Sequence, residues 1–323
     1  VEAAGGMVWN AKNKRIARNV IRVGNDWEKA AQELERIVRQ SRLPKIAAIQ
    51  MCSGSDRTEN LLTIDRLVRE AASQGAHFVS LPEACVQIGA SGDVRGEASV
   101  EGSKAISELR ELAKELGVWL NVGGVAMRMG ERCTNTAFLI DDKGDIVAKY
   151  DKVHLFDNPL TEMMESDYTV PGDPSQIVTA DMVLNGEKCR IGLTICFDMR
   201  FPEVYAKLAE AECDIVVMPS AFMVKTGEAH WETLLRARAI ETQMYCVAAA
   251  QCGLHDNVPG GRVSYGHSMI IDCWGQVVAE LGGQGEGEGQ HGNEGICIAP
   301  LDLENIRKVR DAMPLNHATQ CHR

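Results

Sequence analysis

The segment RIGLTICFDMRFPE, residues 190–203, predicts a strand, a turn and the start of a helix, and it also indicates the chemistry. Its apolar first half predicts a buried strand that ends at Cys196. A polar turn follows, and Pro202 is a favourable first residue for a helix. Cys196 is therefore expected on a sharp strand-to-helix turn, where nucleophilic side chains stand above the end of a sheet. A cysteine buried in the core is the alternative, but the flanking charges of Asp198 and Arg200 favour a functional role.

Outward from this segment, apolar runs typical of strands alternate with runs of helical periodicity. Strands are expected at 45–51, 77–83, 118–126, 134–140, 145–150, 189–196 and 214–220, and near 245–251, 265–272 and 276–281. Helices are expected over 57–74, around 102–116, from Pro202, and over about 228–243. Asp142-Lys143-Gly144 is a hairpin signal. This alternation, with the hairpins, predicts an α/β sandwich with a mixed sheet or sheets.

Length and composition exclude several classes of protein. The chain has 323 residues, more than twice a typical domain of roughly 150 residues, so one large or two ordinary domains are expected. With 45% apolar residues it can bury a sizeable core, and no apolar run approaches the ~20 residues that span a bilayer, which predicts no membrane insertion. A net charge of −11 does not suit nucleic-acid binding and favours a protein that acts on small molecules.

The eleven cysteines are scattered along the chain, and their spacing matches neither a CxxC pair nor a zinc site. Many lie inside strand-like runs such as CRIGLTIC and MYCVAAAQC, where a thiol behaves as a small hydrophobic group. This usage predicts a reducing compartment and no structural metal.

Three segments are expected outside the main pattern. Residues 1–44 form a basic N-terminal extension with nine Lys or Arg against five Asp or Glu, and a short amphipathic helix is expected in it, with Ala31, Leu34, Ile37 and Val38 on one face. The extension resembles an organellar targeting segment; a solvated extension and a partner-binding arm are the alternatives. The glycine-rich stretch 282–295 predicts a surface loop, and 319–323 is a tail that follows the body, 45–318.

Two further strand ends carry groups suited to chemistry. In LPEA, Pro82 favours an extended backbone before it, and Glu83 emerges where the apolar strand stops, where burial would adapt it to act as a general base. A capping glutamate is the alternative. In YDKVHLF, Lys152 ends a strand and His154 follows, and a partly buried lysine can stabilise an oxyanion. A solvated lysine at a strand edge is the alternative for Lys152.

Glu83 in LPEA, Lys152 in DKVHLF and Cys196 in TICFDMRFPE occur in that order along the chain. In these motifs the chain closely resembles the nitrilase superfamily, the carbon–nitrogen hydrolases, over roughly residues 45–318. Each motif alone is a weak signal, but three in order at suitable separations are specific. The resemblance implies a four-layer α-β-β-α sandwich and a Glu-Lys-Cys catalytic set.

The resemblance also implies a role for each residue. Cys196 would attack the amide and form a thioester, Glu83 would act as the base, and Lys152 with the backbone N–H of Phe197 would stabilise the tetrahedral oxyanion. Glu165 fits a second glutamate of the family and would orient Lys152, with a solvated loop glutamate as the alternative. No metal or organic cofactor is implied.

The segments 220–243, 248–255 and 265–280 look like the branch that contains deaminated glutathione amidase. This implies an amidase that converts the terminal amide of deaminated glutathione, or of a similar α-keto-acid amide, to carboxylate and ammonia. The related ω-amidase activity on α-ketoglutaramate is the alternative within the enzymes. An interaction subunit that docks through its basic arm is the alternative of another class.

Candidate substrate contacts follow from the same segments. Arg200 is a cation beside the nucleophile turn that could hold a substrate carboxylate in a bidentate fork, or could pair with Asp198 or Glu203.

A second group of contacts comes from the segment expected to shape the pocket, with Thr226, Gly227, His230 and Trp231. His230 and Trp231 are expected to begin the long helix, and core packing is the alternative for Trp231. The expected partners are a small-molecule amide and further copies of the chain, as a homodimer or larger homo-oligomer. The cytoplasm is the expected compartment, with the mitochondrial matrix as the alternative.

Overall fold

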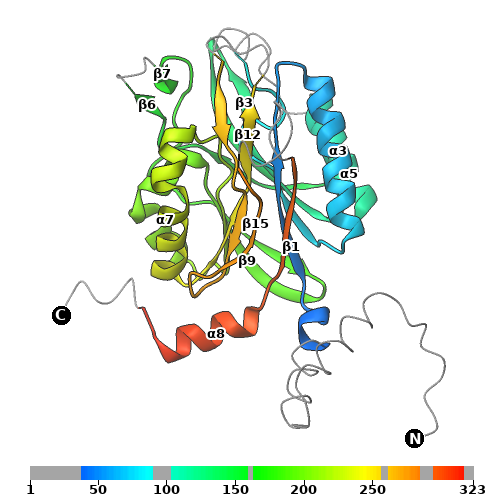
Figure 1. Ribbon diagram of the computed structural model, residues 1–323, viewed down its shortest axis with the longest axis vertical. Helices are drawn as coiled ribbons and strands as arrows, with labels where there is room; N and C mark the ends of the chain where they lie inside the picture. Colours follow the sequence, from blue (N-terminus) through cyan, green and yellow to red (C-terminus); the bar gives the residue numbers. More distant parts are fainter. Residues whose placement is uncertain (1–37, 90–102, 159–162, 256–260, 284–293, 316–323) are drawn as a thin grey trace, which may run out of the picture. The chain divides into compact units, whose positions relative to one another are not determined.

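The computed structural model describes residues 38–89, 103–158, 163–255, 261–283 and 294–315 (Figure 1). The chain divides into two units, Val1–Leu43 and Pro44–Arg323. In the first unit, residues 38–42 are helical. The rest of the expected amphipathic helix lies outside the described residues, as do most of the glycine-rich stretch and the tail.

The second unit contains two large mixed sheets. The first has eight strands, in the order β13 (Val263–Tyr265), β12 (Ala250–Leu254), β1 (Lys45–Met51), β2 (Phe78–Ser80), β3 (Trp119–Met129), β4 (Arg132–Ile140) and β5 (Ile146–Asp151), with β16 (Gly295–Pro300) antiparallel to β1. The second has six strands, in the order β15 (Val277–Glu280), β14 (Met269–Ile271), β11 (Tyr245–Ala248), β10 (Ile215–Val217), β9 (Glu187–Leu193) and β8 (Thr179–Leu184). A small ribbon pairs β6 (Asp157–Asn158) with β7 (Met163–Met164).

Helices cover the outer faces of the two sheets (Figure 1). Helices α3 (Arg57–Ser73) and α5 (Lys104–Leu116) pack on the first sheet, and α6 (Pro202–Glu210) and α7 (Val224–Thr242) pack on the second. Helix α8 (Leu303–Ala312) follows β16. The result is the expected α/β sandwich with the layers helix, sheet, sheet, helix.

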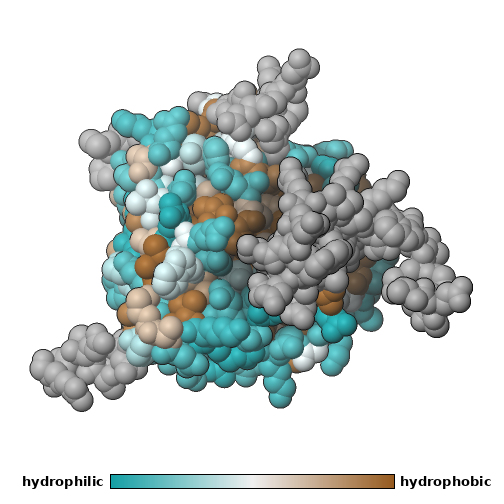
Figure 2. All heavy atoms as spheres, turned by 60° about the horizontal axis from the view of Figure 1, so that its bottom comes forward, coloured by the Kyte–Doolittle hydropathy of each residue, from teal (hydrophilic) through white to brown (hydrophobic). Residues whose placement is uncertain are grey.

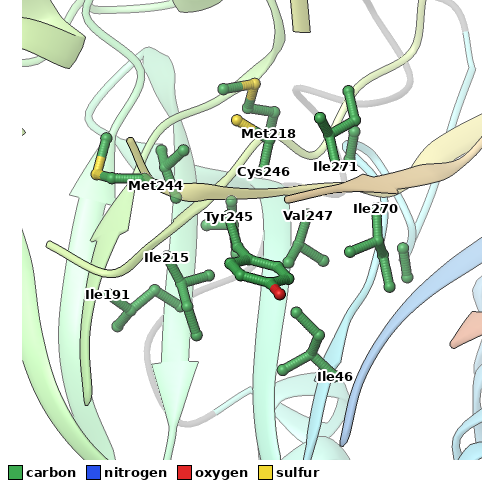
Figure 3. Packing of buried hydrophobic residues seen from close by; sticks show 14 of the residues in the cluster. Ile46, Ile191, Ile215, Met218, Met244, Tyr245, Cys246, Val247, Ile270 and Ile271 are labelled. Atoms are coloured by element: carbon green, nitrogen blue, oxygen red, sulfur yellow. The ribbon is translucent and has the colours of Figure 1, made fainter. Parts of the chain in front are cut away.

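Strand β1 shows how the sequence places the layers. Side chains on a strand point alternately to the two faces, so Ala47 and Ile49 join the core beneath α3 and α5, whereas Ile46 and Ala48 join the core between the sheets. In Figure 3, Ile46 faces the ring of Tyr245 across that core.

Local signals set the ends of several helices. The carboxylate of Asp56 accepts hydrogen bonds from the N–H groups of Thr58 and Glu59, at 2.8 and 3.3 Å, and so caps α3. Gly117, with a φ of 62°, ends α5 in the left-handed conformation that glycine adopts without strain. Pro202 is the first residue of α6, as expected.

Most of the expected elements are present, and two differ in an informative way. Helix α7 begins at Val224, so His230 and Trp231 lie in its second turn and the expectation that they begin the helix was wrong. Gly227 suggests a later start because glycine is a poor helix former. Glycine is nevertheless required at this position of the helix, because a Cβ there would come within 2.2 Å of the Tyr265 ring.

The second difference concerns the run expected as one strand near 245–251. It forms two strands, β11 in the second sheet and β12 in the first, so the chain crosses between the sheets at Ala249. All the residues of this run are buried and apolar up to Ala250, and such a run has no alternation that would reveal the crossing. The run expected as one strand near 265–272 likewise divides between β13 in the first sheet and β14 in the second. Strands β6, β7, β8 and β16 and helix α8 were not expected.

No helix in the described ranges has the length and apolar character required to cross a bilayer. The face shown in Figure 2 is mostly hydrophilic, with small hydrophobic areas.

The two sheets approach closely at Gly123. A β-bulge interrupts the pairing of β3 with β4 between Val122 and Val125, and a Cβ on Gly123 would lie 2.2 Å from Pro219 and 2.6 Å from the carbonyl oxygen of Leu81. Leu81 follows a strand of the first sheet and Pro219 a strand of the second. The absence of a side chain at Gly123 therefore allows the ends of β2 and β10 to meet.

Replacing Gly123 by alanine is expected to destabilise the fold, because backbone and proline atoms surround the site and cannot move away easily. Overpacking of this kind costs roughly 1–3 kcal/mol or more, so the midpoint of thermal unfolding should fall by several degrees. Gly54→Ala is the control, since its Cβ would meet nothing within 4 Å. Equal midpoints for the two variants would contradict the close approach.

Candidate active site

The turn after β9 holds Cys196 in a strained position above the end of the second sheet. Cys196 has a φ of 47°, a conformation that residues other than glycine rarely adopt. Its N–H donates to the carbonyl oxygen of Pro219 at 2.9 Å, and only 8% of the residue is exposed. A short 3₁₀ helix, Cys196–Arg200, continues the chain towards α6. This is the strand, turn and helix predicted from the sequence.

Asp198, which is fully buried, holds this turn in place. Its two carboxylate oxygens accept from the N–H of Ile195 at 3.0 Å, the hydroxyl of Tyr150 at 2.7 Å and the N–H of His154 at 3.0 Å. The ring nitrogen Nδ1 of His154 lies 2.8 Å from the same carboxylate. Because Tyr150 and His154 flank Lys152, Asp198 ties the nucleophile turn to the segment that carries the lysine.

Glu83 extends from the end of β2 in the first sheet towards Cys196. Its Oε2 accepts from the N–H of Ala221 at 3.1 Å, and its carboxylate lies close enough to Cys196 for its charge to raise the pKa of the thiol. The side-chain amide of Gln251 donates to the main-chain oxygen of Glu83 at 3.0 Å. Glu83 is thus fixed by groups from both sheets.

Lys152 is buried between two carboxylates. Its Nζ lies 2.9 Å from Oε1 of Glu83 and 2.8 Å from Oε2 of Glu165, and the lysine is 2% exposed. The side-chain amide of Asn135 donates to both carboxylates, at 3.0 Å each. Glu165 is anchored by the N–H of Phe156, which donates to its Oε2 at 2.7 Å. The four side chains form a closed cluster in which each carboxylate has two side-chain donors.

The charges in this cluster set the protonation states. Burial opposes ionisation of Glu83, but the charge of Lys152 and the hydrogen bonds to the carboxylate keep the pKa of Glu83 below its usual value. Burial likewise opposes the charge on Lys152, yet Glu165 and Glu83 hold the lysine pKa well above its usual value. For Cys196, burial and the charge of Glu83 raise the thiol pKa. The resting site therefore contains an ammonium, ionised Glu83 and a neutral thiol.

These side chains open into a cavity of about 160 Å³. Of the residues singled out from the sequence, those that line it are Glu83, Lys152, Glu165, Cys196, Phe197, Arg200 and Thr226. The structure therefore brings together side chains that are more than 100 residues apart in the chain.

Arg200 lies at the wall of the cavity and has neither of the structural partners considered for it. Asp198 binds Tyr150 and His154 instead, and no ion pair of Arg200 with Glu203 occurs. The guanidinium stands 5.5 Å from the ring centroids of both Phe197 and Phe222. Burial lowers the pKa of Arg200 from its usual value. The described residues thus leave its charge available for a substrate.

Two of the expected substrate contacts are not at the cavity. Trp231 is 1% exposed in the core, where its ring packs on Phe222 and its indole N–H donates to the carbonyl oxygen of His267 at 2.8 Å. His230 is exposed, and its Nδ1 lies 3.3 Å from a guanidinium nitrogen of Arg200. Direct substrate contact was therefore wrong for Trp231, and His230 contacts Arg200 rather than the cavity.

Sequence reasoning missed Asn135, Tyr168 and Arg262, all of which line the cavity. Asn135 lies in the middle of β4, where an asparagine is unusual in a strand and was a usable signal. Burial and the charge of Glu165 raise the pKa of Tyr168 to about 12, so its phenol is neutral. Arg262 precedes a short strand and carries no local signal.

This arrangement can perform nucleophilic acyl chemistry. A thiol lies beside a carboxylate that can take its proton, and an ammonium lies beside both, where an oxyanion would develop. Within the part of the chain that the structure describes, no group of three or more His, Cys, Asp or Glu side chains is arranged to hold a metal ion.

Comparison with known proteins also indicates an enzyme that hydrolyses carbon–nitrogen bonds. The model of the carbon–nitrogen hydrolase family matches residues 45–311. Deaminated glutathione amidase of Homo sapiens is 42% identical over 282 residues, which cover 84% of this chain and 81% of that protein. The protein of the same name from Yersinia enterocolitica is 35% identical over 279 residues, covering 84% and 91%.

Solved structures agree. The NitFhit protein of C. elegans gives a TM-score of 0.75 at 34% identity, over 87% of this chain and 65% of that one, so the chain spans less than two thirds of it. A glutamate-to-glutamine mutant of the amidase from Nesterenkonia sp. AN1, with acrylamide added at its active-site cysteine, gives a TM-score of 0.66 at 26% identity, over 83% of this chain and 97% of that one. The resemblance seen in the three sequence motifs is confirmed: the chain belongs to the carbon–nitrogen hydrolase family, the nitrilase superfamily.

Proposed function

We propose that the protein hydrolyses an α-keto-acid amide, with deaminated glutathione as the substrate, through a thioester on Cys196. The observation that supports this most strongly is the buried ammonium of Lys152 between Glu83 and Glu165, with the Cys196 thiol at the same cavity. Relatives named deaminated glutathione amidase match most of the chain.

The first half of the reaction forms the thioester. The thiol stays protonated at rest because its pKa is raised, so Glu83 takes the proton as Sγ attacks the amide carbon. The oxygen of the tetrahedral intermediate then carries the charge, which the ammonium of Lys152 and the N–H of Phe197 stabilise. Collapse of this intermediate breaks the carbon–nitrogen bond, and Glu83 returns its proton to the departing nitrogen.

The second half releases the acid. Glu83, again a carboxylate, takes a proton from water as the water oxygen attacks the thioester. The second tetrahedral intermediate collapses, the sulfur leaves and regains a proton, and the carboxylate product departs. Glu165 and Asn135 hold Lys152 and Glu83 in the same positions through both halves, because they bind these two side chains rather than the reacting atoms.

The leaving group distinguishes the candidate substrates. Deaminated glutathione retains the secondary amides of a tripeptide, so cleavage next to the keto acid releases a dipeptide with a free amine. The expectation that this substrate releases ammonia was therefore wrong. Ammonia is the product only from a primary amide such as α-ketoglutaramate, the alternative substrate. A new amine is therefore the appropriate readout for deaminated glutathione.

We also propose a cellular compartment and an oligomeric state for the protein. None of the ten cysteines that the structure describes forms a disulfide, which supports a reducing compartment such as the cytoplasm, with the mitochondrial matrix as the alternative. Self-association is supported by Ile240, Trp274 and Val278, large apolar side chains that are 45%, 63% and 37% exposed. Sedimentation velocity would measure the oligomeric state.

The direct test is amine release from deaminated glutathione, with α-ketoglutaramate and ammonia release run in parallel. Cys196→Ala is expected to abolish turnover, because no thioester can form. Cys189→Ala, on strand β9 that leads to the Cys196 turn but away from the cavity, is the control and should retain full activity. Folded wild-type protein that cleaves neither amide would contradict the proposal and favour a role as an interaction subunit.

The pH dependence tests the charge cluster. In the wild type, the depressed pKa of Glu83 keeps the carboxylate ionised, so kcat/KM should fall only in strongly acidic solution, as pH drops through that pKa. In Lys152→Met, burial is no longer opposed by a cation, so the acid limb should move to higher pH. The loss of an oxyanion donor should also lower kcat by about 10²–10³.

Lys149→Met is the control for this profile, since Lys149 lies exposed on the same strand as Tyr150. Its acid limb should coincide with that of the wild type. An unshifted limb in the residual activity of Lys152→Met would show that Lys152 does not set the charge of Glu83.

A further inference from the structure

The described lining of the cavity carries more positive than negative charge. Three cations, Lys152, Arg200 and Arg262, face two carboxylates, Glu83 and Glu165. Both carboxylates form salt bridges with Lys152. No described carboxylate forms an ion pair with Arg200 or Arg262. In a protein whose net charge is −11, this local surplus indicates an anionic ligand with more than one point of attachment.

Arg262 has an incomplete set of hydrogen bonds. One guanidinium nitrogen, Nη2, donates to the carbonyl oxygen of Ala221 at 3.0 Å. Its Nε is buried and has no acceptor. A buried N–H without an acceptor is destabilising, and a carboxylate that enters the cavity would supply one. Guanidinium groups bind carboxylates through two parallel hydrogen bonds, so Nε and a terminal nitrogen suit this ligand.

The neighbours of Arg262 indicate which end of the substrate it would meet. Ala221 accepts from Arg262 and, through its own N–H, donates to Oε2 of Glu83. Glu83 must reach the departing nitrogen to protonate it, so the leaving group lies on the Glu83 side of the cavity. Arg200 instead stands over the ring of Phe197, on the side of the nucleophile turn. The two arginines thus flank different parts of the bound amide.

We propose that Arg262 forms a subsite for a carboxylate on the leaving group, so that the enzyme favours amides whose departing amine is itself an acid. This rests on the proposed function and adds the second half of the substrate to it. The dipeptide released from deaminated glutathione ends in a carboxylate, whereas the ammonia released from α-ketoglutaramate has none. Arg262 would therefore favour deaminated glutathione over α-ketoglutaramate.

The test compares Arg262→Gln with the wild type on three substrates: deaminated glutathione, the same compound with its terminal carboxylate converted to a carboxamide, and α-ketoglutaramate. Glutamine can still donate to Ala221 but has no charge. For deaminated glutathione we expect kcat/KM to fall roughly 10–100-fold in the variant, mainly through KM, as a charge-assisted contact is lost. For the other two substrates it should change less than about threefold.

Arg69→Gln is the matched control, because Arg69 pairs with Asp65 and Glu115 on the surface and does not line the cavity. Equal losses of kcat/KM on all three substrates would overturn the subsite and show that Arg262 acts through Ala221 on Glu83. Unchanged kinetics on deaminated glutathione would overturn it as well. Wild-type protein inactive on all three would overturn the proposed function itself, and the subsite with it.

Discussion

The structure of the site depends on one buried ammonium, that of Lys152. An isolated charge in a protein interior is strongly unfavourable, and it is tolerated only when partners compensate it fully. Here Glu83 and Glu165 compensate it, and each of them in turn depends on the lysine and on the amide of Asn135. Removing Lys152 leaves two buried carboxylates without the cation that compensates their charge. Residues from four separate segments are thereby required to meet at one point.

The two sheets position the base, Glu83, against the nucleophile, Cys196. Glu83 follows β2 in the first sheet, and Cys196 follows β9 in the second. Ala221, in the segment after β10, donates to Glu83, and Pro219 in the same segment accepts from Cys196. A single stretch of backbone therefore fixes the distance between base and nucleophile. The strained φ of Cys196 is maintained because Asp198 and Pro219 hold the turn on both sides.

Local pattern predicted much of this arrangement, and its failures share a physical cause. The ends of β1 and α3, and the turn at Cys196, follow from periodicity, capping and a proline, which are all local. Asn135 and Arg262 were missed because their roles arise only when distant segments meet. Trp231 was misplaced for a similar reason: a tryptophan near a site motif indicates a pocket as readily as a core, and only packing against Phe222 decides between them.

The position of β1 within the first sheet has a consequence for how the chain reaches its native state. Its neighbours are β2, close in the sequence, and β12 and β16, about 200 and 250 residues further on. During synthesis the first strand of the body therefore keeps one edge unpaired until about 250 further residues have been made. Pairings of such long range fold slowly and leave apolar strand edges exposed to other chains. The topology of the first sheet thus leaves one edge of β1 open to other chains until β12 and β16 have been made.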